Sequence, residues 1–356
     1  MERHIRPIGG EFWYDNRICD NEANNLPDSE ILLLNGGQSA IEFIIQNVNF
    51  ENSDYVLMPS YLCPTILYKF KKKNINILFY EINKDLSINI ESIKPLVEHY
   101  HVKALFFINY FGFYHTNDTL LYLKSLKEAG IILIEDSVQM LWFKRLNKFL
   151  GNYVFNSYRK FFPVDGSMVL CNKHLKFIEL NDNYKNLIHE ARNAKTKYIY
   201  MNIGKEEDFL RKFNEAEEWY YKRTTINMVD KESREFLANV NYPLVREQRI
   251  NNYNYLFNKL KEFKEVTSLF DKSLIEDNTP LVLPITINRR DIIRKKLRKY
   301  NIFCPVHWDI THETWPEYFP NSLELSKSIL SIPIDWRYNK NDIDYFLDKF
   351  YSILIE

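Results

Sequence analysis

Residues 156–166 read Asn-Ser-Tyr-Arg-Lys-Phe-Phe-Pro-Val-Asp-Gly and place Ser157 three positions before Lys160. Two short apolar runs flank this segment, at 153–155 and 167–171, and each predicts a strand. A lysine in a loop between strands is in most proteins a solvated charge. The meaning of Lys160 therefore depends on what surrounds it in the fold.

Short apolar runs alternate with helical patterns from residue 31 to about 172, which is typical of βαβ units on a mostly parallel sheet. Most runs are continuous rather than alternating, and this indicates strands buried on both faces. We expect strands at 31–34, 55–58, 75–81, 104–109, 131–135, 153–155 and 167–171, and helices at 39–46, 64–72, 90–100 and 119–128.

The second half of the chain has a different pattern of helices, strands and charges. Residues 205–263 are helical in pattern and highly charged, which predicts connector helices with one solvated face. From residue 280 the α/β pattern restarts, with strands expected at 281–287 and 328–335 and helices at 289–301 and 339–354. We therefore predict a large domain over 1–240 and a smaller α/β domain over 241–356.

Composition excludes several classes of protein. Among 356 residues, 47 basic side chains balance 47 acidic ones, so no net field draws the chain to nucleic acid or an anionic membrane. The four cysteines form no CxxC pair, which gives neither a zinc signature nor a disulfide framework, and no metal site is expected. Without a signal-like N-terminus or a stretch of about 18 apolar residues, we expect a soluble cytoplasmic protein.

Polar residues follow two of the expected strands. The run Ile-Leu-Ile-Glu leads directly into Asp136, with Gln139 three positions later. Ligands of open α/β sheets bind at such carboxyl ends of strands, although an Asp here can also be a helix N-cap or a turn former. Gly36 and Gly37 end one strand and open a helix, where free amides suit a phosphate. This turn lacks the GxGxxG and GK[ST] patterns of nucleotide sites, and a plain tight turn remains the alternative.

In this order the motifs resemble those of fold-type I pyridoxal-phosphate (PLP) enzymes, and specifically the sugar aminotransferases of the DegT/DnrJ/EryC1/StrS family. The resemblance covers nearly the whole chain. It implies an α/β PLP-dependent transferase fold of type I, with a mostly parallel mixed sheet flanked by helices in the large domain and a smaller α/β C-terminal domain. The segments that carry it are GGQSAIEFI (36–44), VLMPSYLCPTI (56–66), ALFFINYFGF (104–113), IEDSVQ (134–139), NSYRKFFPVDGSMVL (156–170), CPVHWD (304–309) and SILSIPID (328–335).

The resemblance also implies a role for each site residue. Lys160 matches the Schiff-base lysine, and Asp136 matches the carboxylate that pairs with the protonated pyridine nitrogen. Gln139 matches the residue near the ring hydroxyl and Ser157 matches a phosphate ligand. The phosphate turn at the helix N-terminus is matched by Gly37, Gln38 and Ser39.

Some positions depart from the family pattern. In the most familiar members the serine lies five residues before the lysine, not three. Cys63 falls where many members place an aromatic ring on the cofactor, so it is either a cofactor contact or a small buried apolar residue. Tyr61, Phe111 or another aromatic residue could supply the ring instead. His307 and Trp308 match the substrate-side loop, with an interior pair as the equal alternative.

The resemblance implies transfer of an amino group from a donor such as glutamate to a nucleotide-linked keto sugar, in surface polysaccharide or related biosynthesis, by a homodimer. A different small keto or amino substrate, or a non-catalytic sensor or scaffold with this fold, stays open as an alternative. A related sugar dehydratase has histidine in place of the lysine, and Lys160 argues against that branch.

Overall fold

The computed structural model describes residues 6–20, 31–143, 147–171, 183–222, 225–270 and 279–356. A sheet of seven strands forms the centre of the chain, in the order β2-β8-β7-β6-β5-β3-β4. Its strands are β2 (Ile31–Leu34), β3 (Tyr55–Pro59), β4 (Asn76–Tyr80), β5 (Val102–Ile108), β6 (Ile132–Asp136), β7 (Tyr153–Phe155) and β8 (Ser167–Leu170). Only β8 runs against the other six, because it pairs antiparallel with both β7 and β2. The predicted mostly parallel mixed sheet is confirmed.

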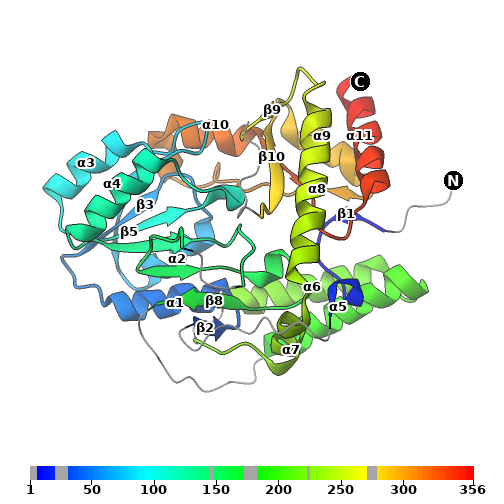
Figure 1. Ribbon diagram of the computed structural model, residues 1–356, viewed down its shortest axis with the longest axis horizontal. Coiled ribbons are helices and arrows are strands. Elements are labelled where there is room, and N and C mark those ends of the chain that lie inside the picture. Colours follow the sequence, from blue (N-terminus) through cyan, green and yellow to red (C-terminus); the bar gives the residue numbers. More distant parts are fainter. Residues whose placement is uncertain (1–5, 21–30, 144–146, 172–182, 223–224, 271–278) are drawn as a thin grey trace.

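Helices connect the parallel strands and cover both faces of this sheet. They are α1 (Gly37–Val48), α2 (Pro64–Lys72), α3 (Ile90–His99) and α4 (Asn117–Glu128). The chain moves from β3 outward to β4 and then back past β3 to β5 and β6. Right-handed crossovers therefore place α2 on one face of the sheet and α3 and α4 on the other (Figure 1). The strand order reverses between β3 and β5, and this is where open α/β sheets bind ligands.

Local sequence signals set the ends of these helices. Pro64 stands at the first position of α2, where its missing N–H costs nothing. Thr116 caps α4 by accepting from the Thr119 amide, and Gly130 follows that helix with φ of +97°, the left-handed conformation that ends helices. The helix boundaries expected at 64–72 and 119–128 agree with the structure to within two residues.

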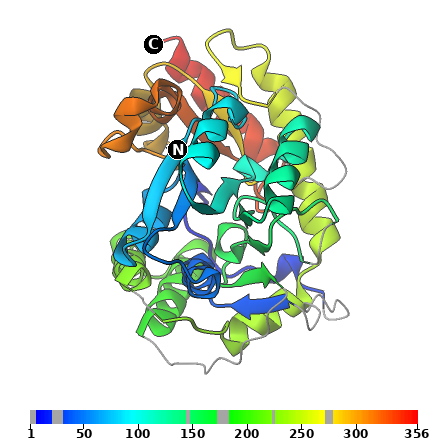
Figure 2. The same cartoon turned by 90° about the vertical axis from the view of Figure 1, so that its left-hand side faces the viewer.

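The C-terminal part has two smaller sheets. A three-stranded antiparallel sheet has the order β12-β10-β9, from β9 (Thr267–Ser268), β10 (Val282–Thr286) and β12 (Ile329–Pro333). β1 (Ile8–Gly9) pairs in parallel with β11 (Ile302–Phe303), so the N-terminal segment lies beside C-terminal elements. Two views at right angles place these elements at the opposite end of the molecule from α1 and β2 (Figure 2). The helices here are α9 (Arg290–Arg298), α10 (Pro320–Ser328) and α11 (Lys340–Leu354).

Four helices lie in sequence between the large sheet and the C-terminal elements. They are α5 (Asn183–Met201), α6 (Glu206–Lys222), α7 (Lys231–Asn239) and α8 (Tyr242–Leu260). α5 and α6 pack against each other as an antiparallel pair, and α8 runs from this region towards the C-terminal sheet (Figure 1). The connector expected at 205–263 is thus three helices, and α5 was not predicted. No helix in the described ranges is both long and apolar enough to cross a bilayer.

Candidate active site

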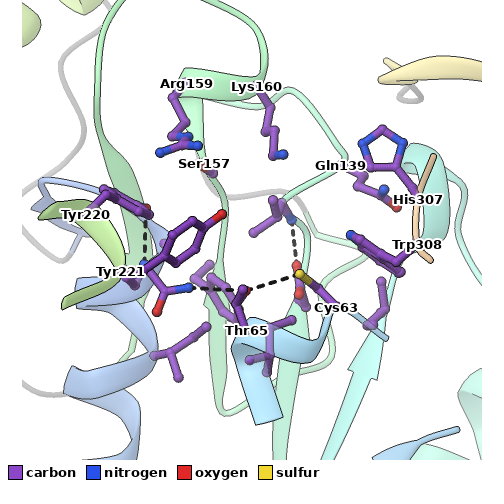
Figure 3. A pocket seen from close by; sticks show the side chains of 18 residues that line it. Cys63, Thr65, Gln139, Ser157, Arg159, Lys160, Tyr220, Tyr221, His307 and Trp308 are labelled. Carbon is purple, nitrogen blue, oxygen red and sulfur yellow. Dashed lines mark hydrogen bonds between the residues drawn. The ribbon is translucent and has the colours of Figure 1, made fainter. Parts of the chain in front are cut away.

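A cavity of about 670 Å³ opens at the carboxyl ends of the parallel strands. Its walls include Cys63 after β3, Ile108 at the end of β5, Asp136 at the end of β6 and Phe155 at the end of β7. The cavity therefore lies at the point where the strand order reverses. We call it the lysine pocket, because the Lys160 side chain points into it from above in Figure 3.

The fold brings nearly all of the predicted site residues together in this pocket. Those that line it are Gly37, Gln38, Cys63, Asp136, Gln139, Ser157, Lys160, His307 and Trp308. Ser39 is the exception. It is buried inside α1, and its hydroxyl donates to Asn35 Oδ1 at 2.6 Å. The chain thus assembles one site from segments that are up to 271 positions apart in sequence, between Gly37 and Trp308.

Lys160 ends a single 3-10 turn (Tyr158–Lys160) between β7 and β8. The Tyr158 amide donates to the Gly166 carbonyl at 2.8 Å, which closes the loop that carries the lysine. Burial lowers the pKa of Lys160, and the neighbouring Arg159 charge lowers it further. A lysine with a lowered pKa has more of the neutral amine that attacks a carbonyl carbon or accepts a proton.

Asp136 is the last residue of β6 and is 3% exposed. Burial raises its pKa to about 7, while the Val138 amide, which donates to Oδ1 at 2.8 Å, and the Lys160 charge oppose the rise. A buried carboxyl with so little compensation favours a cationic N–H partner, which would keep it ionised. The pyridine nitrogen of PLP supplies such a group.

The oxygen and the nitrogen of the Gln139 side-chain amide have different surroundings. Its Oε1 accepts from the Phe111 amide at 2.7 Å, and this contact holds Phe111 at φ of +57°, an unusual conformation for an aromatic residue. The Gln139 Nε2 is buried and has no partner among the described residues. A buried donor without an acceptor is costly, so it fits a ligand oxygen at this position, such as the ring hydroxyl of PLP.

The phosphate end of such a ligand would meet the N-terminus of α1. Gly36 precedes the helix with φ of +153°, and a Cβ there would lie 2.8 Å from the Tyr220 hydroxyl. Gly37 and Ser157 both line the pocket at this end. Free amides at a helix N-terminus attract anions, and the Gln38 amide instead donates to the Tyr220 hydroxyl at 3.4 Å. These donors fit a phosphate, which would have to displace that one long contact.

Four polar side chains of the pocket were not predicted as site residues. They are Thr65, Arg159, Tyr220 and Tyr221. Arg159 forms an ion pair with Glu217 of α6, and its guanidinium lies 4.4 Å from the centre of the Tyr220 ring. Arg159 could have been suspected from its place beside Lys160. The two tyrosines come from α6 without any motif, so only the three-dimensional fold identifies them.

Tyr61 holds the substrate-side loop in place. Its hydroxyl donates to the His307 carbonyl at 2.5 Å and accepts from the Trp308 amide at 2.8 Å. His307 Nδ1 contacts the Ser331 hydroxyl at 2.9 Å, and burial together with the Lys160 charge lowers the His307 pKa to about 3. His307 is therefore neutral at pH 7. Tyr61 does not line the pocket, and Cys63 does, with its Sγ 3.1 Å from the Thr65 hydroxyl.

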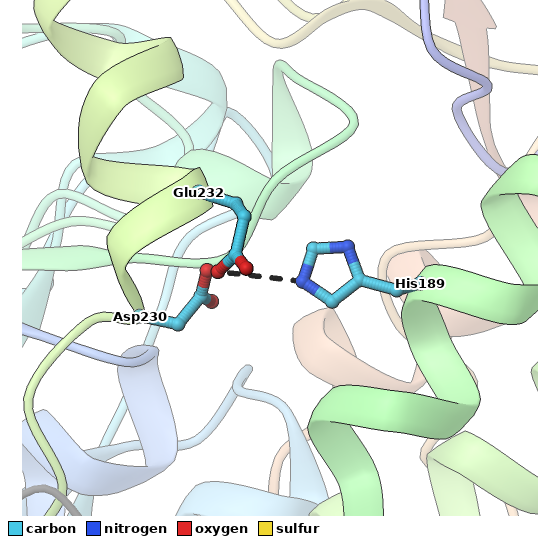
Figure 4. Close-up of side chains that lie close together, drawn as sticks. All are labelled: His189, Asp230 and Glu232. Carbon is cyan, nitrogen blue, oxygen red and sulfur yellow. Dashed lines mark ion pairs between the residues drawn. The ribbon is translucent and has the colours of Figure 1, made fainter.

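A second group of polar residues lies away from this pocket. His189, Asp230 and Glu232 have ligand atoms within 4.8 Å of one another (Figure 4). Asp230 already caps α7 by accepting from the Ser233 amide at 2.9 Å, and Glu232 pairs with Lys185 at 3.1 Å. Capping and ion pairing account for this cluster.

Comparison with solved structures gives many matches of similar fold. The DegT DnrJ EryC1 StrS aminotransferase from Brucella abortus is 15% identical, with a TM-score of 0.61 over 90% of this chain and 85% of that one. The PLP form of Spr1654 from Streptococcus pneumoniae, named as a sugar aminotransferase, is 13% identical, with a TM-score of 0.64 over 91% and 86%. NtdA from Bacillus subtilis, solved with bound PMP, is 13% identical, with a TM-score of 0.64 over 92% and 73%.

The chain has the fold of these aminotransferases. The predicted fold type I is thereby confirmed, over both the large sheet and the C-terminal elements. No family model matches the sequence, and no curated protein matches it either. At 12–15% identity the aminotransferase fold is retained while most side chains differ.

Proposed function

We propose that the chain is a PLP-dependent aminotransferase in which Lys160 carries the cofactor. The observation that supports this most is the meeting of Lys160, Asp136 and Gln139 in one pocket at the strand ends. Each of the three offers the group that one part of PLP requires: an amine for the aldehyde, a carboxylate for the ring nitrogen and an amide donor for the ring hydroxyl. Gly37, Gln38 and Ser157 would hold the phosphate, and Ser39 would support the turn through its hydrogen bond to Asn35.

When bound, PLP supplies an electron sink that stabilises negative charge on the carbon next to the amino group. The chain's own residues do the rest. The Lys160 amine would hold the cofactor and, when free, would move a proton to and from the substrate carbon. The low pKa of this amine suits both tasks. The Asp136 carboxylate would keep the ring nitrogen protonated, and neutral His307 together with Trp308 would face the substrate.

We propose glutamate as the amino donor and a keto sugar, linked to a nucleotide, as the acceptor. The family resemblance of the motifs and the name of Spr1654 as a sugar aminotransferase support this choice. The pathway that fits is surface polysaccharide or related biosynthesis. Because Cys63 replaces an aromatic ring and Ser157 lies closer to the lysine than is usual, a different small keto compound is the second candidate for the acceptor.

We propose further that the protein acts in the cytoplasm as a homodimer, with the chain divided into domains at 1–240 and 241–356. Large apolar side chains are exposed on the α5–α6 pair, among them Met201, Leu210 and Trp219 at 63%, 46% and 48%. Exposed large apolar side chains of this kind can be covered by a second copy of the chain. Sedimentation velocity of the purified protein tests this, and a monomer at micromolar concentration would contradict it.

The function is tested by absorbance spectroscopy of the protein after addition of PLP. We expect a visible band from cofactor bound at Lys160, and glutamate should bleach it by converting the cofactor to its amine form. A protein that binds PLP but is not bleached by glutamate or other amino acids would support the scaffold alternative. A protein that remains colourless would contradict PLP binding itself.

A further inference from the structure

A second cavity, of about 910 Å³, meets the lysine pocket at Arg159, Lys160 and His307. It lies on the other side of the lysine, between the N-terminal residues 9–12 and C-terminal elements that include α9 and β11. We call it the arginine pocket, because five arginines line it: Arg159, Arg249, Arg294, Arg298 and Arg337. A molecule that reacts at Lys160 can extend into this space.

Two of these five arginines have carboxylate partners. Arg337 Nε lies 2.8 Å from Asp335 Oδ1, and Arg159 is paired with Glu217. The other three, Arg249, Arg294 and Arg298, form no ion pair with a described residue. The remaining acidic residue of the lining is Glu11, which is exposed. The pocket therefore has an excess of positive charge that the described parts of the chain do not neutralise.

Arg249 is the most unusual of the three. Its side chain lies in α8 and is 0% exposed. Its Nε donates to the Pro280 carbonyl at 3.1 Å and its Nη2 to the same oxygen at 3.0 Å, while its Nη1 is buried with no partner among the described residues. The nearby Asp335 charge raises the pKa of Arg249 against the effect of burial, but Asp335 is already paired with Arg337. Burying a guanidinium whose only described hydrogen-bond acceptors are carbonyl oxygens is costly, so an anion from outside the chain fits here.

Arg294 and Arg298 stand one turn apart on α9. Like charges at this spacing repel each other and weaken a helix. Burial lowers the pKa of Arg294, and the charges of Arg298 and Arg290 lower it further. Arg294 Nε donates to the Cys304 carbonyl at 2.9 Å, which orients the guanidinium along the wall of the pocket. An oxyanion bound between the two guanidinium groups would attract both of them and offset their mutual repulsion.

We propose that the arginine pocket is a subsite for an oxyanion, a carboxylate or a phosphate, carried by a substrate that reacts at Lys160. Planar guanidinium groups match the geometry of both anions, and several of them around one cavity give recognition of charge as well as shape. The part of this inference that concerns a substrate rests on the proposed aminotransferase function. The oxyanion site itself does not depend on the cofactor.

The first test measures anion binding without any turnover. Isothermal titration calorimetry with inorganic phosphate and with succinate is done on the protein with and without PLP. The double variant R294Q/R298Q should bind at least tenfold more weakly than the wild type, because charge-assisted hydrogen bonds are lost. The control is Lys295→Gln, which removes an exposed charge from the same helix outside both pockets. Equal affinity in the wild type and the double variant, or no binding by the wild type, overturns the subsite.

A second test asks which substrate carries the anion. The PLP form is mixed with glutamate, and the PMP form with keto compounds that do or do not carry a phosphate. If the donor carboxylate binds here, R294Q/R298Q lowers kcat/KM of the glutamate step at least tenfold. If the acceptor anion binds here, only the step with phosphorylated keto compounds falls. Unchanged rates in both steps overturn the substrate role.

These two tests also separate this inference from the proposed function. Arginine-dependent phosphate binding by a protein that takes up no PLP would leave the subsite standing and contradict the aminotransferase. Normal turnover with no arginine-dependent anion binding would support the aminotransferase function and contradict the subsite. Arg249→Lys, which keeps the charge and loses the planar fork, should also weaken phosphate binding at least tenfold. Its melting curve shows whether the fold is intact. If Arg249→Lys does not fold, the result for R294Q/R298Q alone tests the subsite.

Discussion

The lysine pocket and the arginine pocket share Arg159, Lys160 and His307 but are built in different ways. The first includes residues at the carboxyl ends of strands of one sheet, such as Ile108 in β5 and Asp136 in β6. The second is made of the N-terminal segment, α8, α9 and loops of the C-terminal part. Strand ends fix the position of a side chain closely, which suits the bonding of a cofactor. Elements from distant parts of the chain can vary independently, which suits the choice of a substrate.

The largest expected effect comes from Lys160, which is one of the residues common to both pockets. Lys160→Ala should lower turnover by at least about 10³-fold, because both the covalent tether and the proton-transfer group are lost. The fold should survive, since the side chain lies at the surface of a cavity and packs no core. The measurement is amino transfer from glutamate together with borohydride reduction and mass spectrometry. A reduced cofactor adduct in this variant would refute the assignment.

The pH dependence of stability tests how strongly Asp136 is buried in the lysine pocket, and it does not involve the arginine pocket. The pKa of Asp136 in the folded protein is about 7, raised from its ordinary 3.8 mainly by burial. The folded state thus holds this proton more tightly than the unfolded state does. Its contribution to stability is present in full below about pH 4 and is lost as pH rises through 7, by about 4 kcal/mol at most.

Urea unfolding of the PLP-free protein measures this contribution. Between pH 5 and pH 8 the wild type should lose more unfolding free energy than Asp136→Asn, whose amide does not titrate. The same comparison with R294Q/R298Q should show no difference in slope, because those residues belong to the arginine pocket. Parallel curves for the wild type and Asp136→Asn would mean that the carboxyl is better solvated than its 3% exposure indicates.

Asp136 should also matter for cofactor retention. Removal of a charge-assisted hydrogen bond costs about 1.5–3 kcal/mol, so Asp136→Ala should bind PLP about ten- to a hundredfold more weakly. Equilibrium dialysis against PLP measures this, with Glu324→Ala, an exposed acidic residue outside both pockets, as the control. Unchanged PLP affinity and turnover would count against the pairing of Asp136 with the ring nitrogen.

The difference between the two pockets also explains what could be predicted from sequence. Continuous apolar runs predicted the seven strands, and the ranges 31–34 and 153–155 are the same in the structure. Asp136 and Gln139 were identifiable because they directly follow such a run. α5 was missed because its buried face includes Arg192 and Lys195 beside Ala191, which interrupts the apolar pattern that marks a helix. Arg249 was missed for a similar reason, since a charged residue in a helix is ordinarily solvated.

The smallest expected effect concerns the one contact that would compete with a phosphate. The Tyr220 hydroxyl accepts from the Gln38 amide at 3.4 Å, a long and therefore weak hydrogen bond. If a phosphate takes this amide, Tyr220→Phe removes a competitor, and PLP should bind about twofold more tightly. Tyr221→Phe is the matched control, because it removes the same atom from the same wall and leaves the Gln38 contact intact. Weaker PLP binding by Tyr220→Phe would mean instead that this hydroxyl turns to donate to the phosphate, which would make α6 part of the cofactor site. The boundary of the lysine pocket would then extend beyond the strand ends to an element that sequence motifs do not mark.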